Sequence, residues 1–144
     1  MNRTLDSKHA AALALASILF APATVTVQAA GAPTPAIVKP LLTQDLTGIP
    51  GKEVTMLTVE YLPGGASLPH RHDADVFVYV LEGSIITQVD GKEPVTLKAG
   101  EIFRESPADV HRQSANASKT LPAKFLVFMV KDKGKPASRP VDAK

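Results

Sequence analysis

The chain has 144 residues, enough for one domain, and 44% of them are hydrophobic, as in an ordinary globular protein. It contains no cysteine, which excludes thiolate metal sites and cysteine nucleophiles. A formal net charge of only +2, few aromatic residues and no tryptophan argue against a nucleic-acid partner.

The N-terminus has the three-part pattern of a secretory signal. A short basic start precedes an apolar, alanine-rich stretch from Ala10 to Val27, and Val27-Gln28-Ala29 fits the small-x-small rule for signal peptidase. We therefore expect residues 1–29 to be a cleaved signal peptide and the mature protein to be periplasmic or secreted. The alternative is a retained membrane anchor, but Pro22 and the weak hydrophobicity of the second half of the stretch argue against a stable one.

The next segments are expected to be extended or β-rich. Four prolines in residues 30–52 predict an extended arm that is not helical, with apolar anchors such as Leu41 and Leu42. This arm offers a possible route to a homodimer by adding to the sheet edge of a partner. Residues 53–130 are expected to form the β-domain, and residues 131–144 a flexible basic tail.

Within the β-domain, short β-branched runs alternate with turn signals such as Asp90-Gly91. The run 76–81 is apolar at every position, which predicts a strand buried on both faces. One strand every eight to twelve residues, without helical periodicity, predicts an antiparallel sandwich or barrel. The expected strands are 54–62, 76–81, 84–89, 94–97, 101–104, 110–114 and 125–130.

Three of the four histidines fall in this β-domain. His70 and His72 are two residues apart, so on a strand their side chains point to the same face, and His111 can reach that face from a neighbouring strand. Three converging imidazoles suit a divalent transition metal. The alternative is a surface strand that carries two solvated histidines.

Two segments resemble the signatures of the cupin superfamily. Pro63-Gly-Gly-Ala-Ser-Leu-Pro-His70-Arg-His72, followed by Val78-Tyr-Val-Leu-Glu-Gly83, is similar to the first, and Gly100-Glu-Ile-Phe-Arg-Glu-Ser-Pro107-Ala-Asp-Val-His111 to the second. The resemblance implies an all-β fold, a double-stranded β-helix or jelly-roll barrel. It also implies an internal metal held by His70, His72 and His111 together with a glutamate of the first signature.

That glutamate is absent, because the corresponding position, seven residues before Gly83, is Val76. Asp75 is adjacent, but a shift of one residue on a strand turns a side chain to the opposite face. Asp73 is expected in a solvated turn. Glu105 shares strand parity with Phe103, and we predict that it lies inside the barrel, as a catalytic residue or as an acceptor of a hydrogen bond from a metal-binding histidine. The alternative is a rim carboxylate in solvent. Whether Asp75 or Glu105 replaces the missing ligand is left open.

Three neutral imidazoles would leave a bound divalent ion with its full charge, which favours an anionic, chelating small molecule. The metal expected is Fe, Mn, Zn, Ni or Cu. By family analogy, the chain is predicted to be an exported metal-binding cupin with dioxygenase or isomerase chemistry. One alternative is a non-catalytic module that binds or senses a small molecule or metal, and another is a structural remnant with packed histidines.

Overall fold

The computed structural model describes residues 34–141, and every regular element in this range is a β-strand. The expected all-β fold class is therefore confirmed. The predicted signal peptide, residues 1–29, lies outside the described residues. In the described part of the chain, no helix is long and apolar enough to cross a bilayer.

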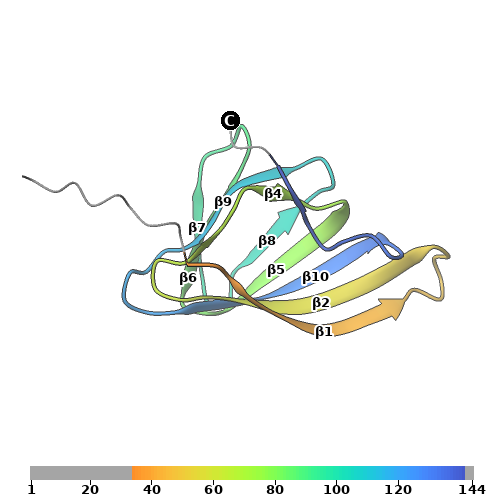
Figure 1. Cartoon of the computed structure of the whole chain (residues 1–144), viewed down its shortest axis with the longest axis horizontal. Helices are drawn as coiled ribbons and strands as arrows, with labels where there is room; N and C mark the ends of the chain where they lie inside the picture. Colours follow the sequence, from red (N-terminus) through yellow and green to blue (C-terminus); the bar gives the residue numbers. More distant parts are fainter. Residues whose placement is uncertain (1–33, 142–144) are drawn as a thin grey trace, which may run out of the picture. The chain divides into compact units, whose positions relative to one another are not determined.

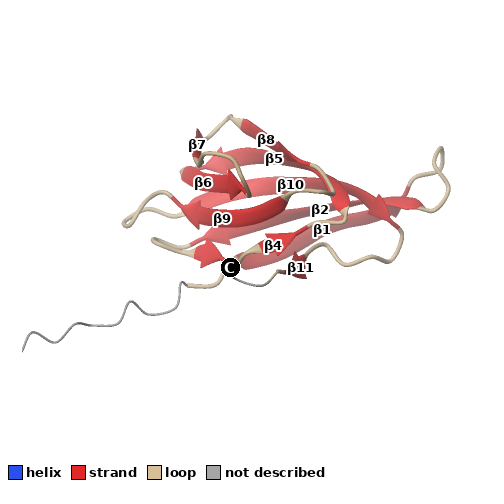
Figure 2. Cartoon of the chain, turned by 90° about the horizontal axis from the view of Figure 1, so that it is seen from above, coloured by secondary structure: helices blue, strands red, loops and turns tan. Residues whose placement is uncertain are grey.

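The strands form two antiparallel sheets (Figures 1 and 2). The first has the order β1-β2-β10-β5-β8, and the second has the order β11-β4-β9-β6-β7, with β3 also paired to β9. The first sheet comprises β1 (Ile37–Asp45), β2 (Lys52–Tyr61), β5 (Ala74–Glu82), β8 (Ile102–Glu105) and β10 (Ala123–Asp132). The second comprises β3 (Ala66–Ser67), β4 (His70–Arg71), β6 (Ser84–Val89), β7 (Val95–Lys98), β9 (Val110–Asn116) and β11 (Arg139–Pro140).

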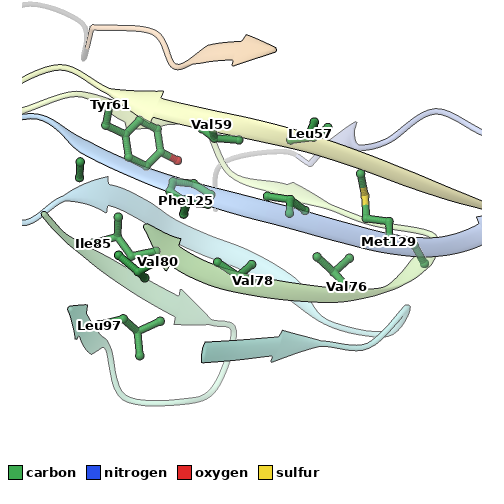
Figure 3. Packing of buried hydrophobic residues seen from close by; sticks show 13 residues of the cluster. Leu57, Val59, Tyr61, Val76, Val78, Val80, Ile85, Leu97, Phe125 and Met129 are labelled. Carbon is green, nitrogen blue, oxygen red and sulfur yellow. The ribbon is translucent and has the colours of Figure 1, made fainter. Parts of the chain in front are cut away.

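The core is built from alternate residues of the strands, because successive side chains of a strand point to opposite faces. Along β10, Phe125, Val127 and Met129 are buried while the residues between them are partly exposed. Val76 and Val80 on β5 are completely buried. Figure 3 shows Phe125, Met129, Val76 and Val80 on neighbouring strands of the first sheet, together with Ile85 and Leu97 of the second sheet.

Gly83 carries the chain from β5 in one sheet to β6 in the other. Its φ angle of 70° lies in the left-handed region, and a Cβ there would meet the carbonyl oxygen of Pro122 at 2.5 Å. Only glycine fits this corner without strain. The sharp change of direction places β5 and β6 in facing sheets.

The outer face of β5 differs from the sequence expectation. Phe77, Tyr79 and Leu81 are 44 to 45% exposed, so the prediction that the run 76–81 is buried on both faces was wrong. The burial pattern of the strand alternates, because within residues 34–141 no layer covers the outer side of this sheet. Phe77 instead contacts Phe128 of β10 on the same outer face, with ring centroids 6.2 Å apart.

The two segments that flank the expected β-domain also take part in the sheets. Part of the expected arm, residues 37–45, is β1, which pairs with β2 and forms one edge of the first sheet. In the expected tail, Lys131 is buried beside Glu53 and β11 pairs with β4, while the flexibility of this segment stays a prediction. The expected homodimer stays a prediction.

Candidate metal centre

The structure brings the three histidines of the β-domain together. β4 and β9 are antiparallel neighbours in which His70 and His111 are direct partners, and His72 follows β4 immediately. The ring centroid of His70 lies 4.9 Å from that of His72 and 5.2 Å from that of His111. One ring nitrogen from each residue falls within 4.8 Å of the others, a spacing compatible with a shared metal ion.

The hydrogen bonds of His70 and His72 fix their tautomers. Nδ1 of His70 lies 2.8 Å from the carbonyl oxygen of Leu68, and Nδ1 of His72 lies 2.5 Å from that of Ala137. A carbonyl oxygen only accepts hydrogen bonds, so both Nδ1 atoms donate. The lone pair of each ring is therefore on Nε2 and is free for a metal.

His111 makes its hydrogen bond through the other ring nitrogen. Its Nε2 is hydrogen-bonded to Oγ1 of Thr87, whereas its buried Nδ1 has no hydrogen-bond partner among the described residues. We assign the single N–H of the neutral ring to Nε2, which leaves the lone pair on Nδ1. A buried nitrogen without a partner is costly in a folded protein, and a metal ion would satisfy it. The donor set therefore fits a transition metal.

Burial keeps two of these rings neutral. The pKa of His72 is lowered chiefly because burial penalises the imidazolium, and its neighbour His70 adds to this effect. Burial, together with the proximity of His70 and His72, lowers the pKa of His111 to about 3. At neutral pH the rings of His72 and His111 are thus uncharged, which is the form that binds metal.

The histidines line a cavity of about 540 Å³ between the two sheets. Its walls are mainly apolar, and they include Leu57, Val78, Phe103, Phe125 and Met129. Four of these, Leu57, Val78, Phe125 and Met129, are labelled in Figure 3. Among the described residues that line the cavity there is no lysine or arginine. The titratable side chains among these lining residues are the three histidines, the phenol of Tyr61 and one carboxylate.

That carboxylate is Glu105, which is only 3% exposed. Its Oε2 lies 3.3 Å from Nδ1 of His111 and 3.7 Å from Nε2 of His72. Desolvation by burial, with a smaller contribution from Asp109, raises the pKa of Glu105 to about 7. The structure places this side chain inside the cavity, where its strand parity with Phe103 predicted it, and not at a solvated rim. A catalytic role for Glu105 stays a prediction.

The other two acidic residues near the first motif point elsewhere. Asp75 accepts a hydrogen bond of 2.9 Å from Arg104, and the Asp75 side chain is 45% exposed. Asp73 pairs with Arg139 at 2.7 Å. Neither lines the cavity, so Asp75 does not replace the missing glutamate.

Sequence reasoning missed three residues around the cluster. Thr87 bonds to His111, the backbone of Ala137 bonds to His72, and the ring of Phe103 is stacked on that of His111 with centroids 5.8 Å apart. Thr87 had a detectable signal, because it is the polar residue in the otherwise apolar alternate series Ile85, Thr87, Val89. The contact of His72 with Ala137 had no such signal in the sequence, because it depends on the path of a segment 65 residues further along the chain.

Comparison with known proteins identifies the family. A family model described as a cupin domain matches residues 57–129, and the chain therefore belongs to the cupin domain family. A germin-like protein of Arabidopsis thaliana, subfamily 2 member 2, is 35% identical over 100 residues, which cover 60% of this chain and 46% of that protein. The chain thus spans about half the length of this relative.

Solved structures agree on the fold. A conserved protein with a double-stranded β-helix domain from Klebsiella pneumoniae superposes with a TM-score of 0.59 at 18% identity, covering 81% of this chain and 91% of that one. An oxalate oxidase in complex with the substrate analogue glycolate superposes with a TM-score of 0.58 at 23% identity, covering 85% and 63%. These likenesses confirm the double-stranded β-helix.

Proposed function

We propose that this protein is a metal-dependent cupin that binds one divalent transition metal at His70, His72 and His111 and a small molecule in the adjoining cavity. The observation that carries the proposal is the orientation of three lone pairs, two of them fixed by backbone carbonyls, at the wall of a cavity of about 540 Å³. This volume is in the range of small-molecule sites.

The lining supports a particular class of ligand. Without a lysine or arginine among the described lining residues, an anionic group would be neutralised at the metal and not by a side chain. The apolar walls favour a hydrophobic body on the same molecule. We therefore propose a compound that combines a chelating oxygen group with an aromatic or aliphatic portion. The similar oxalate oxidase acts on a small acid, whereas this cavity suits a more apolar compound.

Oxygenase chemistry is the reaction class that we propose first. When bound, the metal would supply redox chemistry with dioxygen and would orient the chelating group. The chain would hold the ion, exclude water through the apolar walls and fix the ligand against Phe103 and Phe125. An isomerase would instead need a protein group to move a proton, and Glu105 is the carboxylate within the lining that could do so.

A non-catalytic binding module is the second candidate. The observation that favours it is the position of Glu105 against two of the histidines, where a metal would engage the carboxylate and leave no free general base in the lining. A site of this kind would retain a ligand without turning it over. The two functions differ in oxygen consumption and not in metal content.

The test begins with elemental analysis of the purified protein and of the variants His70→Ala and His111→Ala. We expect about one transition-metal ion per chain in the wild type and little in either variant; equal metal in all three would refute the site. Oxygen uptake is then measured with the Fe, Mn, Ni and Cu forms on catechols, flavonols and diketones. Uptake that His111→Ala abolishes supports the oxygenase, whereas saturable binding without uptake supports the binding module.

Export is a separate proposal that rests on residues 1–29. We expect the protein in the periplasmic or culture fraction, with Ala30 as its first residue. N-terminal sequencing of the fractionated protein checks this. A mature protein that begins at Met1 in the cytoplasm would contradict it.

A further inference from the structure

We propose that Glu105 is the carboxylate ligand of the metal centre, supplied from β8 because its cross-strand partner on β5, Val76, has no ligand atom. This inference rests on the proposed metal site and adds a fourth protein ligand to it. It places the ligand on a different strand, in the second motif and not in the first. Three independent observations carry it: strand register, the spacing of ligand atoms and the charge balance of the cavity.

The register puts Glu105 in the required place. β5 and β8 are antiparallel neighbours, side by side in Figures 1 and 2, and Val76 and Glu105 are direct partners. Both side chains are buried, at 0% and 3% exposure, and both line the cavity. The Cβ atoms of such partners are about 4.5 to 5.5 Å apart, so a side chain as long as glutamate can reach the space in front of the other position.

The spacing of ligand atoms agrees with coordination to one ion. Two ligand atoms that each lie about 2.1 Å from an ion are about 3.0 Å apart at an octahedral angle and about 3.4 Å apart at a tetrahedral angle. Oε2 of Glu105 is 3.3 Å from Nδ1 of His111 and 3.7 Å from Nε2 of His72. Both of these nitrogens carry the free lone pair of their rings in the tautomers assigned above. The carboxylate is therefore placed at ligand distance from two donors already directed at the site.

The charge balance points the same way. Within residues 34–141, His72 and His111 are the basic side chains within 4 Å of the Glu105 carboxylate, and no lysine or arginine lines the cavity. A buried carboxylate without a cationic partner destabilises a fold strongly unless something compensates it. A divalent cation among the three imidazoles would do so. Asp75, in contrast, already has Arg104 as its partner.

The test uses Co²⁺ alone as the probe, because its visible absorption reports both occupancy and the ligand set. Affinity is measured by competition with a chelator in the wild type, Glu105→Gln and the exchanged double variant Val76→Glu/Glu105→Val. Glu105→Gln preserves shape and removes the charge. The double variant keeps one glutamate and one valine in the pair and moves the carboxylate to β5. Glu82→Gln is the matched control, since it removes an acidic charge from an exposed residue at the end of β5.

We expect Glu105→Gln to weaken Co²⁺ binding at least about 100-fold, because loss of an outer partner alone costs about 10- to 100-fold. Its absorption spectrum should change, and the double variant should recover binding to within about tenfold of the wild type. Glu82→Gln should bind like the wild type. Circular dichroism of each variant verifies folding.

The possible failures are distinguishable. Equal affinity of Glu105→Gln and the wild type, or weaker binding with an unchanged Co²⁺ spectrum, would overturn the role of Glu105 as a ligand while the three-histidine site stands. A folded double variant that does not recover binding would refute the equivalence of positions 76 and 105. Absence of Co²⁺ binding in the wild type, or wild-type binding in His111→Ala, would overturn the proposed function itself.

Discussion

Thr87 is hydrogen-bonded through Oγ1 to Nε2 of His111, and both side chains are buried. Thr87 lies on β6 and His111 on β9, which are antiparallel neighbours. With the proton assigned to Nε2, the hydroxyl of Thr87 accepts this bond and holds the orientation of the ring. The other nitrogen, Nδ1, then lies 3.3 Å from the Glu105 carboxylate.

Replacing this hydroxyl should weaken the metal site without removing a ligand. We expect Thr87→Val to lower Co²⁺ affinity about 10- to 100-fold, because the imidazole loses the partner that fixes its tautomer and orientation. Competition with a chelator measures the effect. Thr55→Val is the matched control, since Oγ1 of Thr55 is also buried but has no hydrogen-bond partner among the described residues. Equal losses in both variants would contradict the positioning role of Thr87.

The convergence of the histidines could be predicted from the sequence because it follows from local geometry. The two-residue spacing of His70 and His72 fixes their common face, and His111 lies in a second motif of known order. The opposition of Val76 and Glu105 could not be predicted in this way. It depends on the register between two strands separated by β6 and β7, and that register is set by packing of the whole barrel.

The burial of β5 is a second feature that could not be predicted from the sequence. A continuous apolar run is compatible with burial on one face or on two. The sequence of residues 76–81 does not indicate whether another layer covers the outer face of the sheet. The contact of His72 with Ala137 depends on the return of the chain after β10, a long-range event with no local signal. Local periodicity therefore predicts which side chains share a face, but not which distant residues meet them.

In the metal-free protein, Glu105 and His111 should change the free energy of unfolding in opposite directions as the pH rises. The pKa of Glu105 is raised to about 7 in the fold, so this group makes the protein less stable as pH rises from about 4.5 to 7. The pKa of His111 is lowered to about 3, so its contribution is present above about 6.5 and is lost as pH falls toward 3. The two effects partly cancel between pH 4.5 and 6.5.

A comparison of Glu105→Gln with the wild type isolates the effect of Glu105, because His111 is present in both of these proteins. We expect the free energy of unfolding of Glu105→Gln, relative to wild type, to increase by roughly 2 to 3 kcal/mol between pH 5 and pH 8. Urea unfolding with a chelator present measures this difference. A pH-independent difference would contradict the raised pKa of Glu105.

The hydroxyl group of Tyr61, a residue that lines the cavity, joins two serine side chains. The phenol is 1% exposed, and its oxygen lies 2.7 Å from the hydroxyl oxygens of both Ser67 and Ser114. Tyr61→Phe should therefore lower the free energy of unfolding by about 1 to 3 kcal/mol, because the buried hydroxyl of Ser114 and the partly buried hydroxyl of Ser67 lose their partner. Tyr79→Phe is the matched control; Tyr79 is 45% exposed, and the change should stay within about 0.5 kcal/mol. Similar losses for both, in urea unfolding, would argue against this network.

A comparison of alanine substitutions at Gly83 and Gly91 separates the cost of a positive φ angle from the cost of a steric clash. Both have positive φ angles, 70° and 75°, but a Cβ on Gly83 meets the backbone of Pro122 and Ala123 at 3.0 Å or less, whereas one on Gly91 meets nothing within 4 Å. Gly91→Ala should cost about 1 to 2 kcal/mol, the penalty for a side chain in the left-handed region. Gly83→Ala should cost at least about 2 kcal/mol more, because Ala123 lies in a packed strand. Equal melting temperatures for the two variants would contradict this reading of the corner.

Both ends of the described chain contribute to one cavity, through Pro35 and Ala36 on one side and Ala137 and Ser138 on the other. During synthesis, the enclosure that surrounds the histidines is therefore complete only once the last strand has emerged and folded. The proposed centre would therefore load its metal after release of the finished polypeptide. The ion that it acquired would be set by the metals present wherever folding ends, since such centres discriminate weakly by intrinsic affinity alone.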